Sequence, residues 1–314
     1  MNIGAHFWTV APRIKHDLAG EPPPYARPWS VNVEDPRMGM LRLTGKLREK
    51  ESAREVLVVL HGLAGTCDSY YSQRAAVAAE QAGLACMRMN FRGADGETGD
   101  FYHAGLTSDV SAALESPDLK SYDRIYLLGY SIGGHIALKY GVDYRNERLR
   151  GIAAICSPLD LAECSRIIDS PRSWFYRQYL LIGLKKLYTK LAKNHHLRVP
   201  VSRAMKISSM HEWDETIVAP RHGFDGAADY YRKTSVGPLL DQMKHRALLV
   251  ASRHDPMVPA EAILPWTGKA DGHMETRWIE RGGHVGFPET LDLGFDTERG
   301  VENQVISWLR ESTP

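Results

Sequence analysis

The sequence predicts an α/β protein whose mostly parallel sheet is flanked by helices and carries an inserted helical cap. From residue 56 onward, short apolar runs alternate with longer segments of helical period, which is the pattern of a parallel sheet wrapped by helices. This alternation stops between residues 159 and 242, where tryptophans, tyrosines and lysines occur without a recognisable buried strand. The interruption predicts that the cap is inserted at this point.

Six apolar runs are continuous rather than alternating, as expected of strands that are buried on both faces. These runs begin at Val56, Leu84, Arg124, Gly151, Arg246 and Thr276. Segments of helical period are expected to form the flanking helices at about 69–82, 107–114, 132–143 and 298–311.

The chain is expected to divide into three parts. Residues 1–55 should form an extended N-terminal arm with leading strands, because prolines at positions 22–24, 28 and 36 interrupt helices and sheet ladders. Residues 56–158 and 243–314 should form the core, and residues 159–242 the cap. A cap at the carboxyl ends of the strands would lie where open α/β sheets bind ligands, so it should supply part of a substrate pocket.

The composition narrows the class of protein. The 314 residues are 43% hydrophobic and 25% charged, as in soluble globular proteins, and the formal net charge is only +1, which argues against nucleic acid as a partner. The four cysteines lack the spacing of a zinc site and are expected to be reduced thiols: Cys67, Cys86, Cys156 and Cys164. No secretory signal or membrane-spanning run is recognisable, so a cytoplasmic location is expected.

The most informative segment contains Gly129-x-Ser131-x-Gly133 between a predicted strand and a predicted helix. This sequence in this context is typical of a nucleophile elbow, a sharp turn that exposes a serine hydroxyl at the edge of the sheet. The glycines remove side chains that would collide across the bend. We therefore expect Ser131 to be a nucleophile.

A serine nucleophile needs a general base, and the base needs an orienting carboxylate. Asp255 follows the fifth predicted strand, and His284 follows the sixth predicted strand with glycines around it. These positions favour Asp255 as the acid and His284 as the base. Weaker candidates are Asp160 for the acid, and His254 and His273 for the base.

Acyl transfer also needs N–H groups aimed at the carbonyl oxygen, where negative charge develops. The segment His61-Gly62-Leu63 ends the first predicted strand, where such a loop is expected, and Ile132 directly follows the candidate serine. The backbone amides of Leu63 and Ile132 are therefore expected to form an oxyanion hole. A simple strand-ending turn is the alternative interpretation of the first segment.

These motifs resemble those of the α/β-hydrolase superfamily, and more narrowly of its YheT-like branch. The resemblance extends from about Val56 to the C-terminus. It rests on HGLAGTCDSYY at His61, MNFRGADGE at Met89, FYHAGLTSDV at Phe101, LGYSIGGHIALKY at Leu128, SPLDL at Ser157, APRHGFDGAADYYRKTS at Ala219, SRHDPMVP at Ser252 and GGHVGFPE at Gly282. The resemblance implies an α/β-hydrolase fold and a serine hydrolase or carboxylesterase that uses Ser131, Asp255 and His284.

Two segments depart from that branch. The chain before Val56 matches it poorly, and Trp213-Asp214 stands where a Phe-Asp pair is usual. The branch also shares the segment from Tyr102 to Gly105, in which a structural hydrogen bond is the favoured role for His103.

The expected cap is basic between residues 170 and 211, where it carries nine Lys or Arg residues and no Asp or Glu. Aromatic and leucine side chains are interleaved with these cations, which gives the segment an amphipathic character. Such a segment can contact anionic lipid or attract an acidic substrate. A solvated basic face is the simpler interpretation.

The expected function is hydrolysis of carboxylic esters through an acyl-enzyme, with a small-molecule or lipid ester of short or medium acyl chain as substrate. This chemistry requires no metal and no organic cofactor. The same side chains would serve an amidase, a peptidase, a thioesterase or an acyltransferase. A ligand-binding protein that keeps the fold without turnover is the remaining alternative. The sequence does not indicate an oligomeric state.

Overall fold

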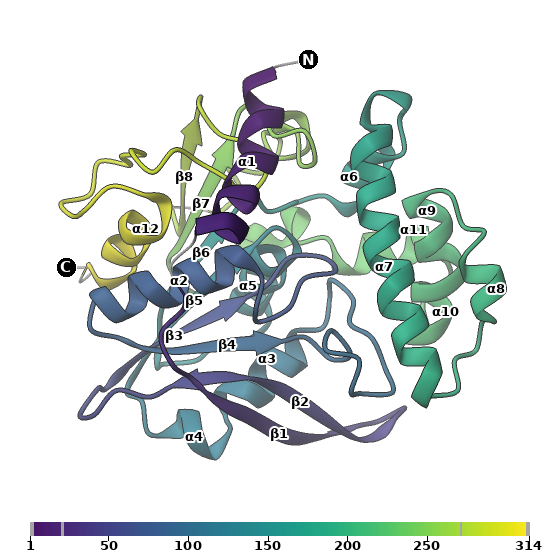
Figure 1. Cartoon of the computed structure of the whole chain (residues 1–314), viewed down its shortest axis with the longest axis horizontal. Coiled ribbons are helices and arrows are strands. Elements are labelled where there is room, and N and C mark those ends of the chain that lie inside the picture. The colour runs from purple at the N-terminus through teal and green to yellow at the C-terminus, as the bar shows by residue number, and fades with distance from the viewer. Residues whose placement is uncertain (1–2, 20–21, 271, 312–314) are drawn as a thin grey trace.

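A computed structural model describes residues 3–19, 22–270 and 272–311, and an eight-stranded sheet forms its centre (Figure 1). The strand order is β1-β2-β4-β3-β5-β6-β7-β8, in which β1, β2 and β4 pair antiparallel and all other neighbours pair parallel. The strands are β1 (Arg27–Asp35), β2 (Gly39–Arg48), β3 (Glu55–Leu60), β4 (Ala85–Asn90), β5 (Arg124–Tyr130), β6 (Leu149–Ile155), β7 (Ala247–Ser252) and β8 (Met274–Ile279). The predicted α/β class, with a mostly parallel sheet, is confirmed.

The strands from β3 to β7 are almost wholly buried, which explains their continuous apolar sequences. Side chains alternate between two cores along β3: Val56 and Val58 pack on one face of the sheet, whereas Leu57 and Val59 pack on the other. The strand β8 was expected to be buried on both faces, and this is wrong. It lies at the edge of the sheet, where several of its residues are partly exposed.

The four helices expected from their periodicity cover the two faces of the sheet (Figure 1). Helices α3 and α5 pack in the core that contains Val56, and α2 and α12 pack in the core that contains Leu57. Each lies within a few residues of its expected position. Their bounds, with the short helix α4, are α2 (Tyr70–Gln81), α3 (Thr107–Leu114), α4 (Pro117–Lys120), α5 (Ile132–Asp143) and α12 (Val301–Arg310).

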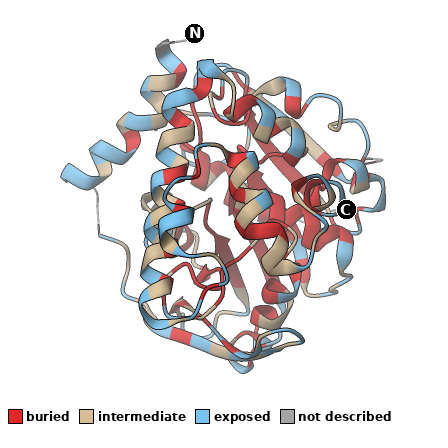
Figure 2. Cartoon of the chain, turned by 90° about the vertical axis from the view of Figure 1, so that its right-hand side faces the viewer, coloured by how far each residue is buried: buried red, intermediate tan, exposed pale blue. Residues whose placement is uncertain are grey.

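The segment between β6 and β7 folds as a group of helices with an apolar core of its own. In Figure 2 this cap faces the viewer, and the buried strands lie behind it. Its elements are α6 (Leu161–Ile168), α7 (Trp174–Asn194), α8 (Val201–Ala204), α9 (Met210–Trp213), a π-helical turn (Asp214–Val218), α10 (Ala219–His222) and α11 (Ala227–Thr234). Short 3-10 turns occupy Pro171–Ser173, Gly237–Gln242 and Ala260–Ala262.

The prediction of an extended N-terminal arm is wrong for residues 3–19, whereas the leading strands predicted before residue 56 are present. Residues Ile3–Ala19 form helix α1, with Pro12 inside it, and the antiparallel strands β1 and β2 lie within residues 27–48. Pro28 lies in β1, which is an edge strand, and edge strands tolerate a residue without an N–H donor. Pro22, Pro23, Pro24 and Pro36 do lie outside helices and strands, whereas Pro12 and Pro28 lie within them.

A buried arginine links the core to the cap. Arg92 follows β4 and binds three carboxylates, those of Asp35, Asp100 and Asp109. Asp100 in turn accepts a hydrogen bond from the cap residue Arg221 at 2.7 Å. Because Arg92 is only 3% exposed, its charge depends on these partners, and the network fixes the loops below the cap.

The four cysteines are buried and unpaired, in agreement with the expectation of reduced thiols. Within the described ranges, no helix combines the length and the apolar character that crossing a membrane requires.

Candidate active site

Ser131 lies in the tight turn between β5 and α5, with a strained backbone φ of 53°. The flanking glycines are required by close backbone contacts. A Cβ atom at Gly129 would lie 2.4 Å from the backbone of Gly133, and a Cβ atom at Gly133 would lie 2.4 Å from the carbonyl oxygen of Leu60. The glycine spacing therefore allows the strand, turn and helix to approach and to present the serine.

Ser131, His284 and Asp255 form a continuous chain of hydrogen bonds. Nε2 of His284 lies 2.9 Å from Oγ of Ser131, and Nδ1 lies 2.9 Å from Oδ2 of Asp255. Because an ionised carboxylate only accepts, Nδ1 carries the imidazole proton and Nε2 can accept the serine proton. His284 is 6% exposed and Asp255 is 4% exposed, so water competes little for these bonds.

The loop after β7 fixes the Asp255 carboxylate. Its Oδ1 accepts hydrogen bonds from the backbone N–H groups of Met257 at 2.8 Å and Val258 at 2.9 Å. These bonds leave Oδ2 directed at His284, as an orienting acid requires.

The weaker candidates for the acid and the base lie elsewhere. Asp160 caps helix α6 by accepting the backbone N–H of Glu163 at 3.0 Å. The His254 side chain is 44% exposed and lies near Glu280, and His273 is also exposed. None of the three takes part in the hydrogen-bond chain at Ser131.

The backbone N–H groups of Leu63 and Ile132 remain available. The N–H groups on either side of Leu63 donate to the hydroxyls of Tyr71 at 2.9 Å and Tyr102 at 2.7 Å. Among the residues that the structure describes, neither Leu63 nor Ile132 donates its N–H to an acceptor. Both residues line the same cavity as Ser131, so their amides can serve a ligand oxygen there.

His61 supports this loop, a role that the sequence analysis did not recognise. Its Nε2 accepts the backbone N–H of Phe91 at 3.2 Å, so its Nδ1 carries the proton and donates to the carbonyl of Gly62 at 2.8 Å. Complete burial lowers the pKa of His61 to about 4, which keeps the imidazole neutral. The neutral ring therefore fixes the backbone directly before Leu63.

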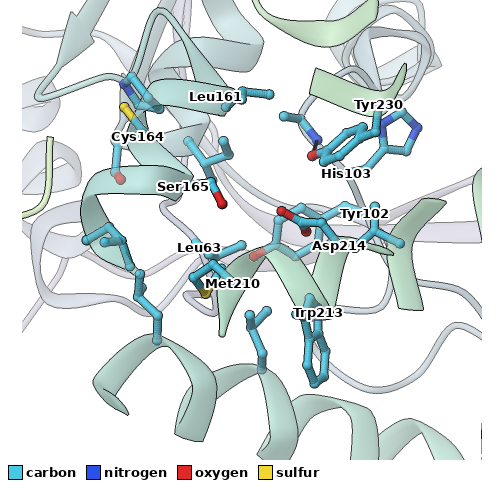
Figure 3. A pocket seen from close by; sticks show the side chains of 18 of the residues that line it. Leu63, Tyr102, His103, Leu161, Cys164, Ser165, Met210, Trp213, Asp214 and Tyr230 are labelled. Atoms are coloured by element: carbon cyan, nitrogen blue, oxygen red, sulfur yellow. Dashed lines mark hydrogen bonds between the residues drawn. The ribbon is translucent and has the colours of Figure 1, made fainter. Parts of the chain in front are cut away.

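A cavity of about 1080 Å³ lies between the core and the cap and reaches Ser131 and His284 (Figure 3). Most of its wall is apolar and comes from the core loop at Leu63 and from cap residues such as Leu161, Met210 and Trp213. A second cavity, of about 980 Å³, also reaches Ser131 and His284 and is bounded by α1 and α7. The candidate nucleophile therefore lies where these two cavities meet.

Helix α1 packs against the loop that carries His284. Oγ1 of Thr9 accepts the backbone N–H of His284 at 2.9 Å and donates to the carbonyl of Ala5 at 2.8 Å. A Cβ atom at Gly283 would lie 2.4 Å from that carbonyl, so the close approach of helix and loop needs a glycine. Sequence reasoning missed Thr9 because no local pattern indicates that α1 contacts this loop.

His103 makes the structural hydrogen bond that was the favoured interpretation. Its Nδ1 accepts the backbone N–H of Gly105 at 3.1 Å, and its ring lies 4.4 Å from that of His222. Burial lowers the pKa of His103 well below its ordinary value, and lowers the pKa of His222 to about 4. His103 also lines the large cavity, so it can contact a ligand as a neutral donor.

Cys156 lies beside Asp255 and His284, and ligand atoms of the three residues lie within 4.8 Å of one another. Burial raises the pKa of the Cys156 thiol well above its ordinary value, so it is protonated and a poor metal ligand. The other two residues are already joined by their mutual hydrogen bond. The grouping is therefore explained without a metal ion.

Comparison with known proteins places this geometry in a family. The family model described as alpha/beta hydrolase fold matches residues 55–290. YheT of Escherichia coli (strain K12), which carries the name of an esterase, is 31% identical over 260 residues, covering 81% of this chain and 76% of that protein. Human phospholipase ABHD3 is 27% identical over 248 residues, covering 76% of this chain but only 60% of that protein.

Solved structures share the fold at low sequence identity. The Pyrococcus furiosus esterase Pf2001 aligns with a TM-score of 0.54 at 14% identity, covering 86% of this chain and 87% of that chain. The 2,6-dihydroxy-pseudo-oxynicotine hydrolase aligns with a TM-score of 0.57 at 15% identity, covering 91% of this chain and 67% of that chain. These similarities establish the architecture.

Proposed function

The chain belongs to the α/β hydrolase family and is a hydrolase that acts on esters; from this premise we propose that it works through an acyl-enzyme formed on Ser131. His284 is the general base and Asp255 orients it. The observation that carries the proposal is the hydrogen-bond chain from Ser131 through His284 to Asp255, at the wall of a largely apolar cavity.

Each step of the cycle has a group to perform it. Nε2 of His284 takes the Ser131 proton as Oγ bonds to the ester carbonyl carbon, and the amides of Leu63 and Ile132 donate to the resulting oxyanion. The carbon–oxygen bond to the alcohol then breaks, and the alcohol leaves with the proton from His284. Water, deprotonated by His284, attacks the acyl carbon; the bond from that carbon to Oγ of Ser131 then breaks, His284 returns the proton to Oγ, and the acid leaves.

The substrate is a small-molecule or lipid ester whose acyl chain is short or medium. The mainly apolar cavity walls suit the hydrocarbon part of an ester. The names of the relatives, an esterase and a phospholipase, support carboxylic esters over amides. A panel of matched esters, thioesters and amides, assayed for hydrolysis and for transfer to added alcohols, distinguishes this proposal from the alternative acyl-transfer activities.

Covalent labelling of Ser131 tests the proposed nucleophile. A fluorophosphonate probe, which reacts with activated serines, should label the native protein on Ser131. Ser131→Ala should abolish labelling and lower kcat by about a thousandfold or more, because the covalent route is lost. Circular dichroism and thermal unfolding should show that the variant remains folded. Labelling of another serine, or full activity of the variant, would contradict the proposal.

We also infer that α1 and α7 contact anionic lipid beside the mouth of the second cavity. Helix α1 turns an apolar stripe of Phe7, Val10, Ile14 and Leu18 outward, and these side chains are between 41% and 82% exposed. Helix α7 likewise exposes Trp174, Phe175, Tyr179 and Ile182. It also carries five Lys or Arg residues and no acidic residue, so the partner that complements it is an anionic surface.

A further inference from the structure

Three polar side chains of the cap face the large cavity: Ser165 on α6, Asp214 in the π-helical turn and Tyr231 on α11. We call them the cap cluster. Figure 3 shows the oxygens of Ser165 and Asp214 turned toward one another inside the cavity. The rest of the wall is mainly apolar, so these groups form a polar spot on a surface that otherwise suits hydrocarbon.

The hydrogen bonds of the cap cluster have a defined direction. Oη of Tyr231 lies 2.7 Å from Oδ2 of Asp214 and 3.0 Å from Oγ of Ser165. Tyr231 has a single hydroxyl proton and a carboxylate only accepts, so Tyr231 donates to Asp214 and accepts from Ser165. Within the described part of the chain, the other oxygen of Asp214, Oδ1, has no hydrogen-bond partner.

Asp214 also lacks a cationic partner. Among residues 3–19, 22–270 and 272–311, no Lys, Arg or His nitrogen forms an ion pair with it. A carboxyl group held in an apolar cavity by one hydrogen bond is poorly stabilised when it is charged. In agreement, burial raises the pKa of Asp214 to about 7.

We propose that the cap cluster binds a hydrogen-bond donor, a hydroxyl or an ammonium group, on the part of the ester that enters the cavity. This inference rests on the proposed ester hydrolysis and specifies its substrate class. The ligand donor would bond to Oδ1 of Asp214, while the aromatic rings of Trp213 and Tyr230 line the cavity beside it. An unsubstituted hydrocarbon chain would leave this oxygen without a partner, and a carboxylate on the chain would repel it.

The experiment compares medium-chain esters that differ only in the terminal group of one chain: methyl, hydroxyl, ammonium or carboxylate. The terminal group is placed on the acyl chain in one series and on the alcohol in the other, because either part can enter the cavity. In the series whose variable chain enters the cavity, the hydroxyl or ammonium ester should exceed the methyl ester in kcat/KM by about tenfold. The carboxylate ester should be the poorest substrate.

Two variants separate this role from a structural one. Asp214→Asn keeps the shape and can still accept from Tyr231, but it removes the charge, so the preference for the ammonium ester should fall to near unity. Asp225→Asn changes an exposed cap aspartate outside the cavity and should keep the full preference. For each variant, kcat/KM for the ammonium ester is divided by kcat/KM for the methyl ester. A general loss of activity affects both values and cancels in this ratio.

The pH dependence of the ratio of kcat/KM for the ammonium ester to kcat/KM for the methyl ester provides a test on the native protein. The preference for the ammonium ester should rise as the pH increases through about 7, because Asp214 loses its proton there. The surrounding ionisable groups are Tyr230 and Tyr231 on α11, Asp169 after α6, His211 near the Tyr231 ring, and His103 near the Tyr230 ring. Any effect of pH on the reacting groups acts on both esters alike and cancels in the ratio of their kcat/KM values.

The outcomes are distinguishable. If no ester of either series is hydrolysed, the proposed function itself fails. If the methyl ester is hydrolysed as well as the hydroxyl and ammonium esters in both series, the ester hydrolysis stands and the inference about the cap cluster is overturned. An equal loss on all substrates in Asp214→Asn, with unchanged ratios, would assign Asp214 a structural role only.

Discussion

At the level of single residues, the position of His284 depends on a hydroxyl that lies 275 residues earlier in the chain. Thr9 accepts the backbone N–H of His284, and no other described residue does so. A buried N–H group without an acceptor costs about 1–3 kcal/mol, so the loop would shift or open without this hydroxyl. Thr9 is therefore a positioning residue for His284, the proposed general base, rather than a catalytic residue.

Thr9→Val tests this positioning role. The variant keeps the branched shape but removes the acceptor, so kcat should fall by about five- to tenfold while KM changes little, because Thr9 does not line the large cavity between the core and the cap. Steady-state kinetics with a soluble ester gives both values. Thr9→Ser restores the hydroxyl and should restore kcat. A loss in the valine variant that appears only in KM would show that Thr9 acts on substrate binding instead.

At the level of elements, α1 and α7 combine two features that are rarely found together on a surface that remains in water. Both helices expose large apolar side chains, and they bound the cavity that leads to Ser131 and His284. Lys186 and Lys193 are exposed on the same helix, so charge and apolar area are both presented by α7. A lipid surface held there would lie next to the site that takes its esters.

Vesicle binding tests the contact of these helices with lipid. Wild-type protein should cosediment with vesicles that contain phosphatidylglycerol, and less with pure phosphatidylcholine, because the cations need anionic headgroups. Replacing Phe7 and Ile14 of α1 by serine should weaken binding by about tenfold or more, since two apolar side chains no longer enter the interface.

A control for this experiment is Met40→Ser, which removes an exposed apolar side chain from β2, away from these helices. It should leave vesicle binding unchanged. Hydrolysis of a soluble ester should persist in both variants. Equal binding of the wild type to both kinds of vesicle, or no effect of the α1 substitutions, would show that this surface does not contact anionic lipid.

At the level of the whole molecule, the buried histidines determine how stability depends on pH. Burial lowers the pKa of five of them: His61, His103, His135, His222 and His245. These rings are neutral in the folded protein, whereas the unfolded chain protonates them below about pH 6.5. The unfolded state therefore binds more protons, and the free energy of unfolding decreases as the pH falls below this value.

Chemical unfolding between pH 7.5 and pH 4.5 should show this decrease. His61, with its pKa at about 4, contributes about 3 kcal/mol of the loss once the pH has fallen to its folded-state pKa. Asp214 opposes the trend, because its raised pKa makes the folded state retain a proton between about pH 7 and pH 3.8. The histidines outnumber it, so the net change should be a loss of stability.

His222→Phe provides the matching variant, since Nε2 of His222 has no hydrogen-bond partner among the described residues. The phenyl ring preserves the edge contact with Phe101 and cannot be protonated. The variant should lose less stability than the wild type over the same pH range. Stability that rises steadily on acidification would contradict the assignment of neutral histidines.

The sequence by itself determined the central sheet from β3 onward, its four flanking helices and the family. Continuous apolar runs predict buried strands and helical periods predict amphipathic helices. Both patterns are local, because they depend only on the residues of one segment. The glycines around Ser131 are local as well, because they are needed by one tight turn. The choice of Asp255 and His284 followed from parallel topology, which brings strand ends to one edge.

Only the tertiary structure decided which distant segments touch these elements. The N-terminal segment was expected to be extended because its prolines were visible, whereas its contact with the His284 loop depends on packing across 275 residues. The placement of Asp214 inside the cavity is likewise a property of the folded cap, since nothing local distinguishes it from an exposed aspartate such as Asp225. Long-range contacts leave no periodic pattern in a single sequence. Each one is stabilised by side chains from two distant segments, and these segments meet only when the chain folds.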